Sequence, residues 1–266
     1  MNVAIILAGG TGSRVNSEIP KQFIEIAGQM MITHALAPFG KSELVDNIQI
    51  VAPKEWREKI EFEMFEDPQS IVGEKFLGFS DPGENRQMSI FNALRDLKNT
   101  FDCAGENDAS ANVSADTRQN SDLARYMAHS RLTNIDGVII HDAARPFVTV
   151  EDIDDCLRAL DEHDGAMPVL PMKDTVYFSR SGKRVDELLN RNFIYAGQAP
   201  EAFLFAKYYL ANEELLPDRI LLIKGSTEPA IMAGMDVAMI PGDQRNFKVT
   251  TGEDLARAKE ILESNM

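Results

Sequence analysis

Residues 3–14 read Val-Ala-Ile-Ile-Leu-Ala-Gly-Gly-Thr-Gly-Ser-Arg, and residues 20–23 follow as Pro-Lys-Gln-Phe. The apolar run 3–8 predicts a strand that is buried on both faces, as strands of parallel sheets are. The glycines after it predict a loop whose backbone N–H groups can approach a ligand, because no Cβ stands in the way. Successive N–H groups of this kind form a concavity suited to phosphate oxygens.

Two cations accompany this loop. Arg14 closes it, and Lys21 follows Pro20, which fixes the direction of the chain. The loop is not a P-loop, because no Gly-Lys-Ser/Thr closes it, and it lacks the third glycine of the dinucleotide fingerprint. The pattern favours a nucleoside triphosphate site. The alternative is that the glycines only make a turn and the cations are solvated surface charges.

Composition limits the function classes. The chain has 266 residues and a formal net charge of −15, which argues against non-specific binding to nucleic acid or to anionic membranes. The run 3–8 is too short for a signal peptide, and no apolar run is long enough to cross a bilayer. Cys103 and Cys156 lack metal-ligand spacing and are too few for a disulfide framework. We expect a cytoplasmic protein with two inert thiols.

Short apolar runs alternate with amphipathic segments along the chain. This alternation predicts an α/β fold, with one domain over residues 1–266 built on a mostly parallel sheet that carries helices on both faces. The expected strands are 3–7, 48–52, 138–140, 166–171 and 237–240. The expected helices are 31–39, 87–97, 150–160, 200–212 and 252–264.

Two segments depart from this rhythm. Residues 102–121 are rich in Ala, Ser, Asn and Asp, which predicts a mobile surface insertion without chemistry of its own. Residues 173–198 predict an antiparallel arm, in which 175–178 and 192–195 are joined through a turn at Ser181-Gly182. An arm with so many apolar residues needs a surface to cover them. Exchange of the arm with a second subunit explains this composition better than packing of the arm on its own domain.

A second candidate site lies at the end of the expected strand 138–140, where His141 and Asp142 follow. Ligands of parallel sheets gather beyond the carboxyl ends of the strands, so Asp142 is expected to face the glycine loop. A carboxylate there can hold Mg²⁺ together with substrate phosphates. The alternative is that Asp142 caps a turn and pairs with Arg145. His141 is expected to pack or to bond to the backbone, because an ionised phosphate nucleophile needs no general base.

Two further segments carry candidate residues. Gly83 permits close approach of the backbone, while Glu84 and Ser89 offer an acceptor and a hydroxyl near a helix N-terminus. Read alone, this segment is most simply a helix cap. Lys248 precedes the last expected helix, where it could meet a phosphate group. The alternative for Lys248 is a solvated surface position.

Six blocks in this order resemble the 2-C-methyl-D-erythritol 4-phosphate cytidylyltransferases and the related ribitol-5-phosphate cytidylyltransferases. The blocks are LAGGTGSR (7–14), PKQF (20–23), GENRQMS (83–89), HDAARPF (141–147), DTV (174–176) and NFKVTT (246–251). The resemblance covers essentially the whole chain apart from 102–121. It implies a Rossmann-like nucleotidyltransferase fold, a homodimer joined through the arm, and Mg²⁺-dependent transfer of CMP from CTP to a polyol phosphate with release of pyrophosphate.

The resemblance also implies roles for single residues. Arg14 and Lys21 would stabilise the triphosphate and the pentacoordinate α-phosphorus, with Lys248 as a further cation near the same phosphates. Thr175 and Arg191 would reach from the arm into the site of the partner subunit. The residues expected to contact the nucleotide are Ala8, Gly9, Gly10, Gly12, Gly83, Glu84 and Ser89. Those expected to contact the polyol phosphate are Asp142, Arg145, Thr175 and Arg191, with Asp142 also near the metal.

Some positions depart from the methylerythritol pattern. Ala199 stands where that pattern has Thr, and residues 225–230 replace a Thr-Asp-Glu-Ala block; both changes are expected at the polyol-phosphate pocket. Residues 53–56 and 195–198 look more like the ribitol branch, whereas 141–146 look like the methylerythritol branch. We expect methylerythritol phosphate as the acceptor, with ribitol 5-phosphate as the alternative.

Two other function classes share part of this pattern. A CTP-binding regulator without chemistry has less need of four cationic and acidic residues at the phosphates. A sugar-1-phosphate nucleotidyltransferase would share the glycine-rich start, but the block 141–146 and the arm argue against it. No fused reductase domain is expected after Met266.

Overall fold

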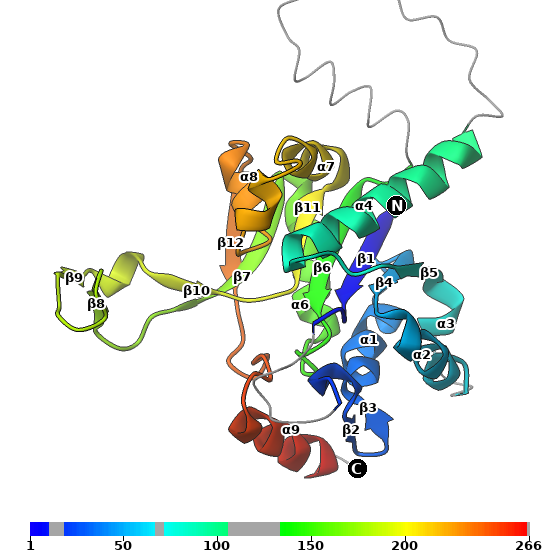
Figure 1. Cartoon of the computed structure of the whole chain (residues 1–266), viewed down its shortest axis with the longest axis horizontal. Coiled ribbons are helices and arrows are strands. Elements are labelled where there is room, and N and C mark those ends of the chain that lie inside the picture. Colours follow the sequence, from blue (N-terminus) through cyan, green and yellow to red (C-terminus); the bar gives the residue numbers. More distant parts are fainter. Residues whose placement is uncertain (11–18, 67–71, 106–133, 265–266) are drawn as a thin grey trace, which may run out of the picture.

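The computed structural model describes residues 1–10, 19–66, 72–105 and 134–264. In these ranges a central sheet has the order β10-β7-β11-β6-β1-β4-β5, with β12 paired to β7 (Figure 1). The strands are β1 Asn2–Leu7, β2 Glu25–Ile26, β3 Gln29–Met30, β4 Asn47–Val51, β5 Phe76–Ser80, β6 Gly137–Asp142, β7 Gly165–Pro171, β8 Val176–Phe178, β9 Glu187–Leu189, β10 Tyr195–Gly197, β11 Glu201–Leu204 and β12 Val237–Pro241. The α-helices are α1 Met31–Lys41, α2 Lys54–Glu66, α3 Val72–Lys75, α4 Arg86–Gly105, α6 Val150–Arg158, α7 Phe205–Glu213, α8 Glu228–Met232 and α9 Gly252–Ser264.

The sheet is mostly parallel, as expected. β1 pairs in parallel with β4 and with β6, β4 pairs in parallel with β5, and β7 with β12. β11 runs antiparallel between β6 and β7. In this register Leu7 lies opposite both Val51 and Asp142, so β1 and β6 end side by side. The carboxyl ends of the parallel strands therefore meet at one edge, where ligands of open α/β sheets bind.

Helices cover both faces of the sheet. Successive side chains of β1 alternate, so that Ala4 and Ile6 pack against α1, α2 and α6, while Val3 and Ile5 pack against α4 and α7. All four side chains are fully buried. This explains the unbroken apolar run of residues 3–8, because a strand covered on both faces has no polar side to present.

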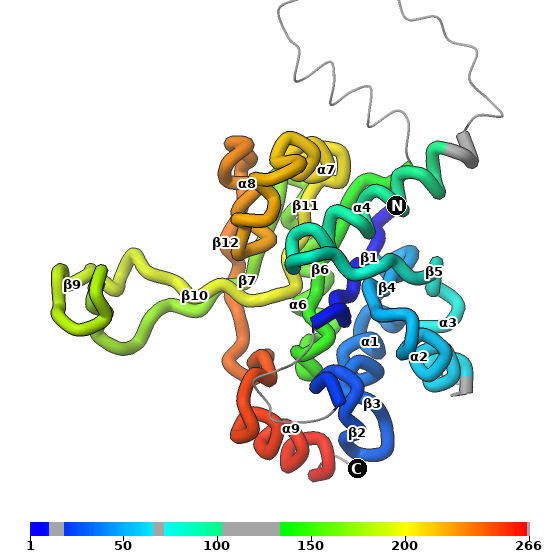
Figure 2. Tube along the Cα trace, in the orientation of Figure 1, coloured from blue at the N-terminus to red at the C-terminus, as the bar shows by residue number. Residues whose placement is uncertain are grey.

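The C-terminal helix α9 lies apart from the sheet, beside β2 and β3 (Figure 2). Its N-terminus is capped by the side chain of Asp254, whose Oδ2 accepts hydrogen bonds from the backbone N–H groups of Thr250 and Thr251, each at 2.9 Å. A hydrogen bond from Thr250 Oγ1 at 2.7 Å, together with these backbone bonds, lowers the pKa of Asp254 to about 2. The expected helix 252–264 is confirmed with these bounds.

Two expectations about the bounds of elements were wrong, and one strand was not predicted. The expected helix 200–212 begins only at Phe205, because 201–204 form the strand β11 between β6 and β7. The expected helix 87–97 extends to Gly105 in α4, so the first residues of the expected insertion 102–121 are helical; the rest of that insertion lies outside the described residues. The strand β5 was not predicted, since Gly78 interrupts its apolar pattern.

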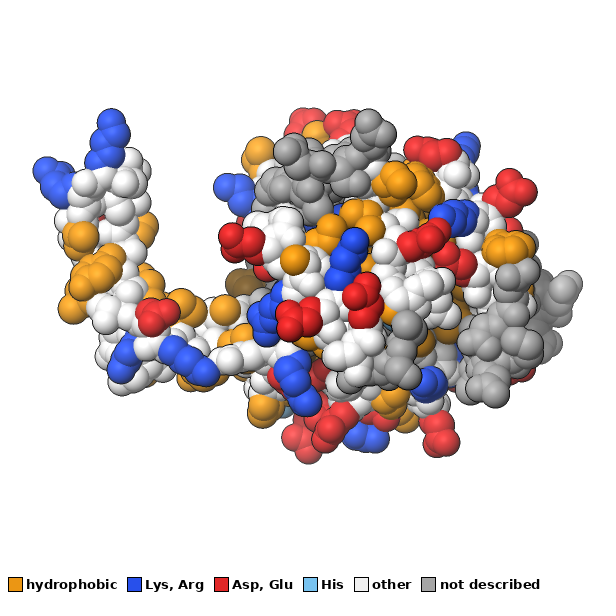
Figure 3. Space-filling view, turned by 90° about the horizontal axis from the view of Figure 1, so that it is seen from below, with side chains coloured by type: hydrophobic (Ala, Val, Ile, Leu, Met, Phe, Trp, Pro, Cys, Tyr) orange, Lys and Arg blue, Asp and Glu red, His pale blue; other side chains and the backbone are white. Residues whose placement is uncertain are grey.

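The arm differs from the expected hairpin in its pairing. Val176–Phe178 pairs with Glu187–Leu189, not with 192–195, and the connection includes Gly182 at φ 67°. Tyr195–Gly197 instead joins the main sheet antiparallel to β7. The arm extends away from the sheet and helices as a separate projection (Figures 1 and 3). Among the described residues, no helix is long and apolar enough to span a membrane.

Candidate active site

A cavity of about 450 Å³ opens at the carboxyl ends of β1 and β6. Its walls come from five parts of the chain: the end of β1 with the glycine loop, the 3-10 turn Lys21–Phe23, the start of α4, the end of β6 with the turn after it, and the segment before α9. The described lining residues are Leu7, Gly9, Gly10, Lys21, Gln22, Gly83, Glu84, Asn85, Arg86, Ser89, Asp142, Ala144 and Lys248. The sheet thus brings together blocks that lie more than 200 positions apart.

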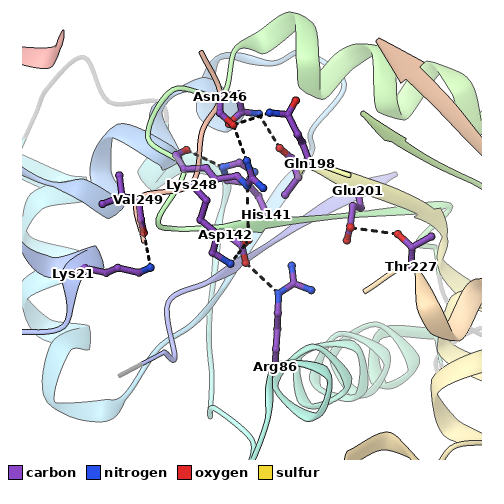
Figure 4. Close-up of polar contacts among 12 residues, drawn as sticks. Lys21, Arg86, His141, Asp142, Gln198, Glu201, Thr227, Asn246, Lys248 and Val249 are labelled. Atoms are coloured by element: carbon purple, nitrogen blue, oxygen red, sulfur yellow. Dashed lines mark hydrogen bonds and ion pairs between the residues drawn. The ribbon is translucent and has the colours of Figure 1, made fainter. Parts of the chain in front are cut away.

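Asp142 lies between two cations in this cavity (Figure 4). Its Oδ2 accepts a hydrogen bond from Lys248 Nζ at 2.8 Å, and its Oδ1 accepts one from Arg86 Nε at 3.2 Å. Burial alone would raise the pKa of Asp142, but Arg86 and Lys248 hold it well below its usual range. Asp142 is therefore a permanent carboxylate that is already engaged by cations on both oxygens.

His141 and Arg145, on either side of Asp142 in the chain, are not among the described residues that line the cavity. Arg145 Nε lies 3.9 Å from Asp142 Oδ2, but its Nη1 donates to the backbone oxygen of Asn246 at 2.7 Å, and Arg145 is not one of the described lining residues. His141 is fully buried against Phe39, and its Nε2 donates to the backbone oxygen of Arg145 at 3.0 Å. Burial lowers the pKa of His141 to about 4, so the ring is neutral near pH 7. The expected packing role of His141 is confirmed.

The glycine loop is described only at its start. Gly9 and Gly10 line the cavity, whereas Ala8 is buried behind it with its N–H bonded to the Val51 oxygen at 2.8 Å. Gly12 and Arg14 lie outside the described residues. A Cβ on Gly9 would stand 2.8 Å from Pro82 Cβ, which explains why this position requires glycine.

Gln22 holds the start of the loop in place. Its Nε2 donates to the backbone oxygens of Ala8 at 2.7 Å and Gly10 at 2.6 Å, and the residue is almost fully buried. The next residue, Phe23, stacks on Trp56 with ring centroids 4.4 Å apart. Sequence reasoning quoted Gln22 in the block 20–23 but assigned it no role, because an amide beside a lysine carries no signal of its own.

Lys21 lines the same cavity from the opposite side to Asp142. Its Nζ donates to the backbone oxygen of Val249, the residue after Lys248. The two lysines that sequence reasoning placed at the phosphates therefore approach one space from different segments (Figure 4). A cavity that concentrates several cations in an acidic protein is suited to an anionic ligand.

The start of α4 forms the third wall. Ser89 Oγ accepts from the Gly83 N–H and donates to the Asn85 oxygen, each at 2.9 Å. The cap of the helix is Asn85, whose Oδ1 accepts from Met88 N at 2.7 Å. The helix-cap interpretation of this segment is therefore correct for Asn85. Gly83, Glu84 and Ser89 nevertheless line the cavity, and their contact with a nucleotide stays a prediction.

Sequence reasoning missed two charged residues here. Arg86 was quoted within its block but not singled out, although it lines the cavity and binds Asp142. Glu201 is buried on β11 and accepts a hydrogen bond from Thr227 Oγ1 at 3.3 Å. Burial raises the pKa of Glu201 to about 7, partly offset by Arg86 and Arg145. The sequence marks Glu201 only as an acidic residue in an apolar segment, and that segment was expected to be part of the helix 200–212.

The arm residues Thr175 and Arg191 lie together, but not in this cavity. They line a separate hollow of about 430 Å³ on the arm, with Leu188, Leu189, Asn190 and Asn192. Arg191 Nη1 donates to the backbone oxygen of Lys173, which orients the guanidinium within the arm. Within one chain the structure therefore separates these two residues from Asp142.

The donor set limits how a metal could bind. Among the described residues no group of three or more His, Cys, Asp or Glu side chains could hold a metal ion. Both oxygens of Asp142 already face cations, although a carboxylate has about four lone-pair sites and so retains free ones. The site fits a cation that takes one protein carboxylate and its other ligands from substrate phosphates and water, as Mg²⁺ does.

Comparisons with known proteins agree with this geometry. A relative from Rubrobacter xylanophilus named 2-C-methyl-D-erythritol 4-phosphate cytidylyltransferase is 33% identical, with 98% of this chain and 94% of the relative aligned. One of the same name from Geobacillus kaustophilus is 31% identical over 99% of this chain and 97% of the relative. The crystal structure of 4-diphosphocytidyl-2C-methyl-D-erythritol synthase from Anaerococcus prevotii superposes with a TM-score of 0.71 at 22% identity, covering 99% and 96% of the two chains, and shows the shared Rossmann-like fold.

The family model for 2-C-methyl-D-erythritol 4-phosphate cytidylyltransferase matches residues 2–104 and 105–264, which is nearly the whole chain. The chain is therefore an enzyme of the nucleotidyltransferase class, and the regulator and sugar-1-phosphate alternatives fall away. With the cavity, its cations and this match together, the chain belongs to the 2-C-methyl-D-erythritol 4-phosphate cytidylyltransferase family.

Proposed function

We propose that this enzyme uses the cavity between Lys21, Asp142 and Lys248 to transfer CMP from CTP to 2-C-methyl-D-erythritol 4-phosphate. The observation that carries the proposal is the meeting of Lys21, Lys248 and Arg86 with a glycine loop in one space of about 450 Å³. A nucleoside triphosphate supplies the anionic groups that these cations match.

The wall at α4 suits the nucleoside, because Gly83, Glu84 and Ser89 offer backbone and side-chain polar groups without a cluster of charge. The wall at the glycine loop suits the phosphates, because Gly9 and Gly10 expose backbone next to Lys21. In this orientation the α-phosphorus lies toward Asp142 and Lys248. Arg14 lies outside the described residues and belongs to the proposed set only through the family resemblance.

The reaction needs positioning and charge rather than a base. An oxygen of the acceptor phosphate forms a bond to the α-phosphorus, and the bond from that phosphorus to the β-phosphate oxygen breaks, releasing pyrophosphate. Because the acceptor phosphate is already ionised, no proton has to be removed. Asp142 is paired with two cations, and His141 is neutral and bonded to the backbone, so neither is placed as a base. Lys21 and Lys248 stabilise the charge that develops on the phosphoryl oxygens.

Mg²⁺ would be held by the triphosphate together with one oxygen of Asp142, and it would neutralise phosphate charge there. The cations around Asp142 keep this carboxylate ionised and oriented toward the cavity whether or not a metal is present. The protein's own contribution to the site is therefore a fixed carboxylate and at least three cationic side chains.

We further propose that the enzyme is a homodimer in which the arm completes the partner's site. The described arm carries exposed apolar side chains, among them Phe193 at 77% and Leu188 at 62% exposure, with Tyr177 and Val185 nearby (Figure 3). Such a patch on a projecting segment is typical of an interface. Thr175 and Arg191 share a hollow on this arm, which suits recognition of the acceptor's phosphate.

The test is pyrophosphate release from CTP and Mg²⁺ with each polyol phosphate offered separately. Turnover with methylerythritol 4-phosphate supports the proposal, and turnover only with ribitol 5-phosphate replaces the acceptor. Binding of CTP without turnover on either acceptor would contradict both. The Lys21→Ala variant serves as the background control, because its cavity lacks the cation proposed for the chemical step.

A further inference from the structure

Glu201 lies behind the wall of the cavity that Arg86 and Asp142 form. β11 runs antiparallel to β6, with Glu201 directly opposite Ile140. Residues paired in this way share a face of the sheet, and Asp142, two positions after Ile140, shares it too. This is the face covered by α4, since Ile140 belongs to the same buried cluster as Ile90 and Leu94 of α4. Both carboxylates therefore lie beneath the first turn of α4, where Arg86 begins the helix.

The carboxylate of Glu201 is only half satisfied. Its Oε1 accepts from Thr227 Oγ1 at 3.3 Å, while its Oε2 is buried without a hydrogen-bond partner in the described chain. A buried carboxylate oxygen without a donor is costly, so a partner is expected. The charges that favour the ionised form of Glu201 are those of Arg86 and, less strongly, Arg145.

Arg86 has donors to spare. Among the described residues its only hydrogen bond uses Nε, which donates to Asp142 Oδ1, so neither Nη is bonded to a described residue. A guanidinium offers five N–H donors in one plane. Figure 4 shows the Arg86 guanidinium directed into the space between Asp142 and Glu201. The second guanidinium, that of Arg145, already uses Nη1 on the Asn246 backbone.

Of the two segments that depart from the methylerythritol pattern, one contacts Glu201 and the other precedes it closely in the chain. Thr227, in the replaced block 225–230, donates to Glu201, and Ser226 accepts from Tyr208 through its backbone oxygen at 2.7 Å. Ala199 lies two residues before Glu201, and its oxygen accepts from Asn246 at 2.8 Å. Neither segment is among the described residues lining the cavity. Thr227 therefore connects the replaced block to Glu201 by a hydrogen bond.

We propose that Glu201 is a positioning residue: held by Thr227, its carboxylate orients the Arg86 guanidinium so that an Nη group of Arg86 donates to an oxygen of the bound nucleotide. Nε of Arg86 stays on Asp142, one Nη edge faces Glu201, and the remaining donors face the cavity. The nucleotide's identity as CTP rests on the proposed function. Arg86 then binds substrate directly, while Glu201 acts only through it.

A double-mutant cycle on CTP affinity tests the proposal. At pH 8, where Glu201 is mostly ionised, Glu201→Gln keeps the shape and an acceptor for Thr227 but removes the charge that orients Arg86. We expect the Kd for CTP to rise about tenfold, the KM for CTP to rise to match, and kcat to stay within about twofold of wild type. A tenfold change in Kd is within the usual range of the coupling energy between neighbouring side chains. Glu201→Asp restores the charge on a shorter side chain and should recover part of the affinity.

The decisive comparison is made in the Arg86→Ala background. If Glu201 acts through Arg86, then Glu201→Gln has no further effect there. An equal loss of affinity in both backgrounds, or no loss in the wild-type background, would overturn the proposal. Thr227→Val is the second variant if Glu201→Gln does not fold: it should weaken CTP binding less strongly, and only when Arg86 is present. CTP binding is measured without an acceptor. A failure of turnover with both polyol phosphates would therefore count against the proposed function, while the binding cycle would still test the role of Glu201.

Discussion

Lys248 Nζ lies 2.8 Å from Asp142 Oδ2, although the two residues are 106 positions apart in the chain. This pair joins the segment before α9 to the end of β6, and it gives the buried carboxylate a cation that also faces the cavity. Arg86 supplies the second cation on the other oxygen. The site is therefore organised around one anion that holds two of the groups proposed to bind phosphates.

Removing the lysine of this pair should lower the activity of the enzyme while leaving its thermal stability nearly unchanged. In Lys248→Ala, Asp142 keeps Arg86, so the fold should persist, while kcat/KM falls by roughly a hundredfold, as for loss of one charge-stabilising donor. The measurement is steady-state kinetics with thermal unfolding. Lys259→Ala, on the exposed side of α9, is the matched control and should retain wild-type kinetics. Equal losses of activity in both variants would contradict the role of Lys248.

Lys21 should have the larger effect on the chemical step. Lys21→Ala removes the cation on the loop side of the cavity and should cost about 3–4 kcal/mol of transition-state stabilisation, by analogy with one oxyanion donor. Single-turnover measurements at saturating CTP and acceptor isolate this step. Lys54→Ala serves as control, because its side chain is 78% exposed and outside the cavity. Near wild-type turnover in Lys21→Ala would rule out the assigned role.

Gln22 should matter through the loop it holds. In Gln22→Glu the two donated bonds, to Ala8 at 2.7 Å and Gly10 at 2.6 Å, are lost and a carboxylate faces two carbonyl oxygens. We expect a free energy of unfolding lower by roughly 1–3 kcal/mol and a raised KM for CTP. Gln244→Glu makes the same change at an exposed position and should do neither. Unchanged KM in Gln22→Glu would show that the loop does not depend on this amide.

Glu201 predicts a pH dependence of stability. Its pKa rises from an ordinary value of 4.5 to about 7 on folding, so between these values the native state binds more protons than the unfolded state. The contribution of Glu201 to the free energy of unfolding is therefore fully present below about pH 4.5 and is lost as the pH rises to about 7. The total loss is at most about 3 kcal/mol. The pH dependence from Asp142 has the opposite sign. Its pKa is lowered on folding, so its contribution to the free energy of unfolding is lost only as the pH falls below its ordinary pKa of 3.8.

Urea unfolding of wild type and Glu201→Gln at pH 5 and pH 8 measures this effect. The wild type should lose stability relative to Glu201→Gln as the pH rises between the two values. A difference that stays constant would show that Glu201 titrates near its ordinary pKa. Combined with the binding cycle, such data would show a buried acid that lowers stability above neutral pH while it orients Arg86.

The arm can be tested by mixing two inactive variants. Lys21→Ala lacks a residue of the cavity, and Arg191→Ala lacks a residue of the arm. If the arm serves the partner's site, a mixed dimer holds one intact site, and an exchanged equimolar mixture should recover about a quarter of wild-type activity. If each arm serves its own site, the mixture stays inactive. Light scattering on Leu188→Asp, which charges an exposed arm side chain, should show loss of the dimer.

Local sequence signals predicted much of the fold correctly. The structure confirms the strands near residues 3–7, 48–52 and 138–140 and the helix 252–264. The unbroken apolar runs fit only buried strands, and the capped amphipathic segment fits only a surface helix. The errors have a common cause. β11 contains Glu201 in a run that reads as helix, and only its place between β6 and β7 makes it a strand.

What the sequence determined by itself is the α/β architecture and the family, since an apolar strand, a glycine loop and the ordered blocks are local features. Only the tertiary structure decided which charges meet. Arg86 carries no signal in its own segment and Glu201 only a weak one, yet the packing of α4 on the sheet and the antiparallel pairing of β11 with β6 bring both near Asp142. The pairing of charges depends on distances through space, and residues far apart in the chain acquire those distances only when the sheet forms.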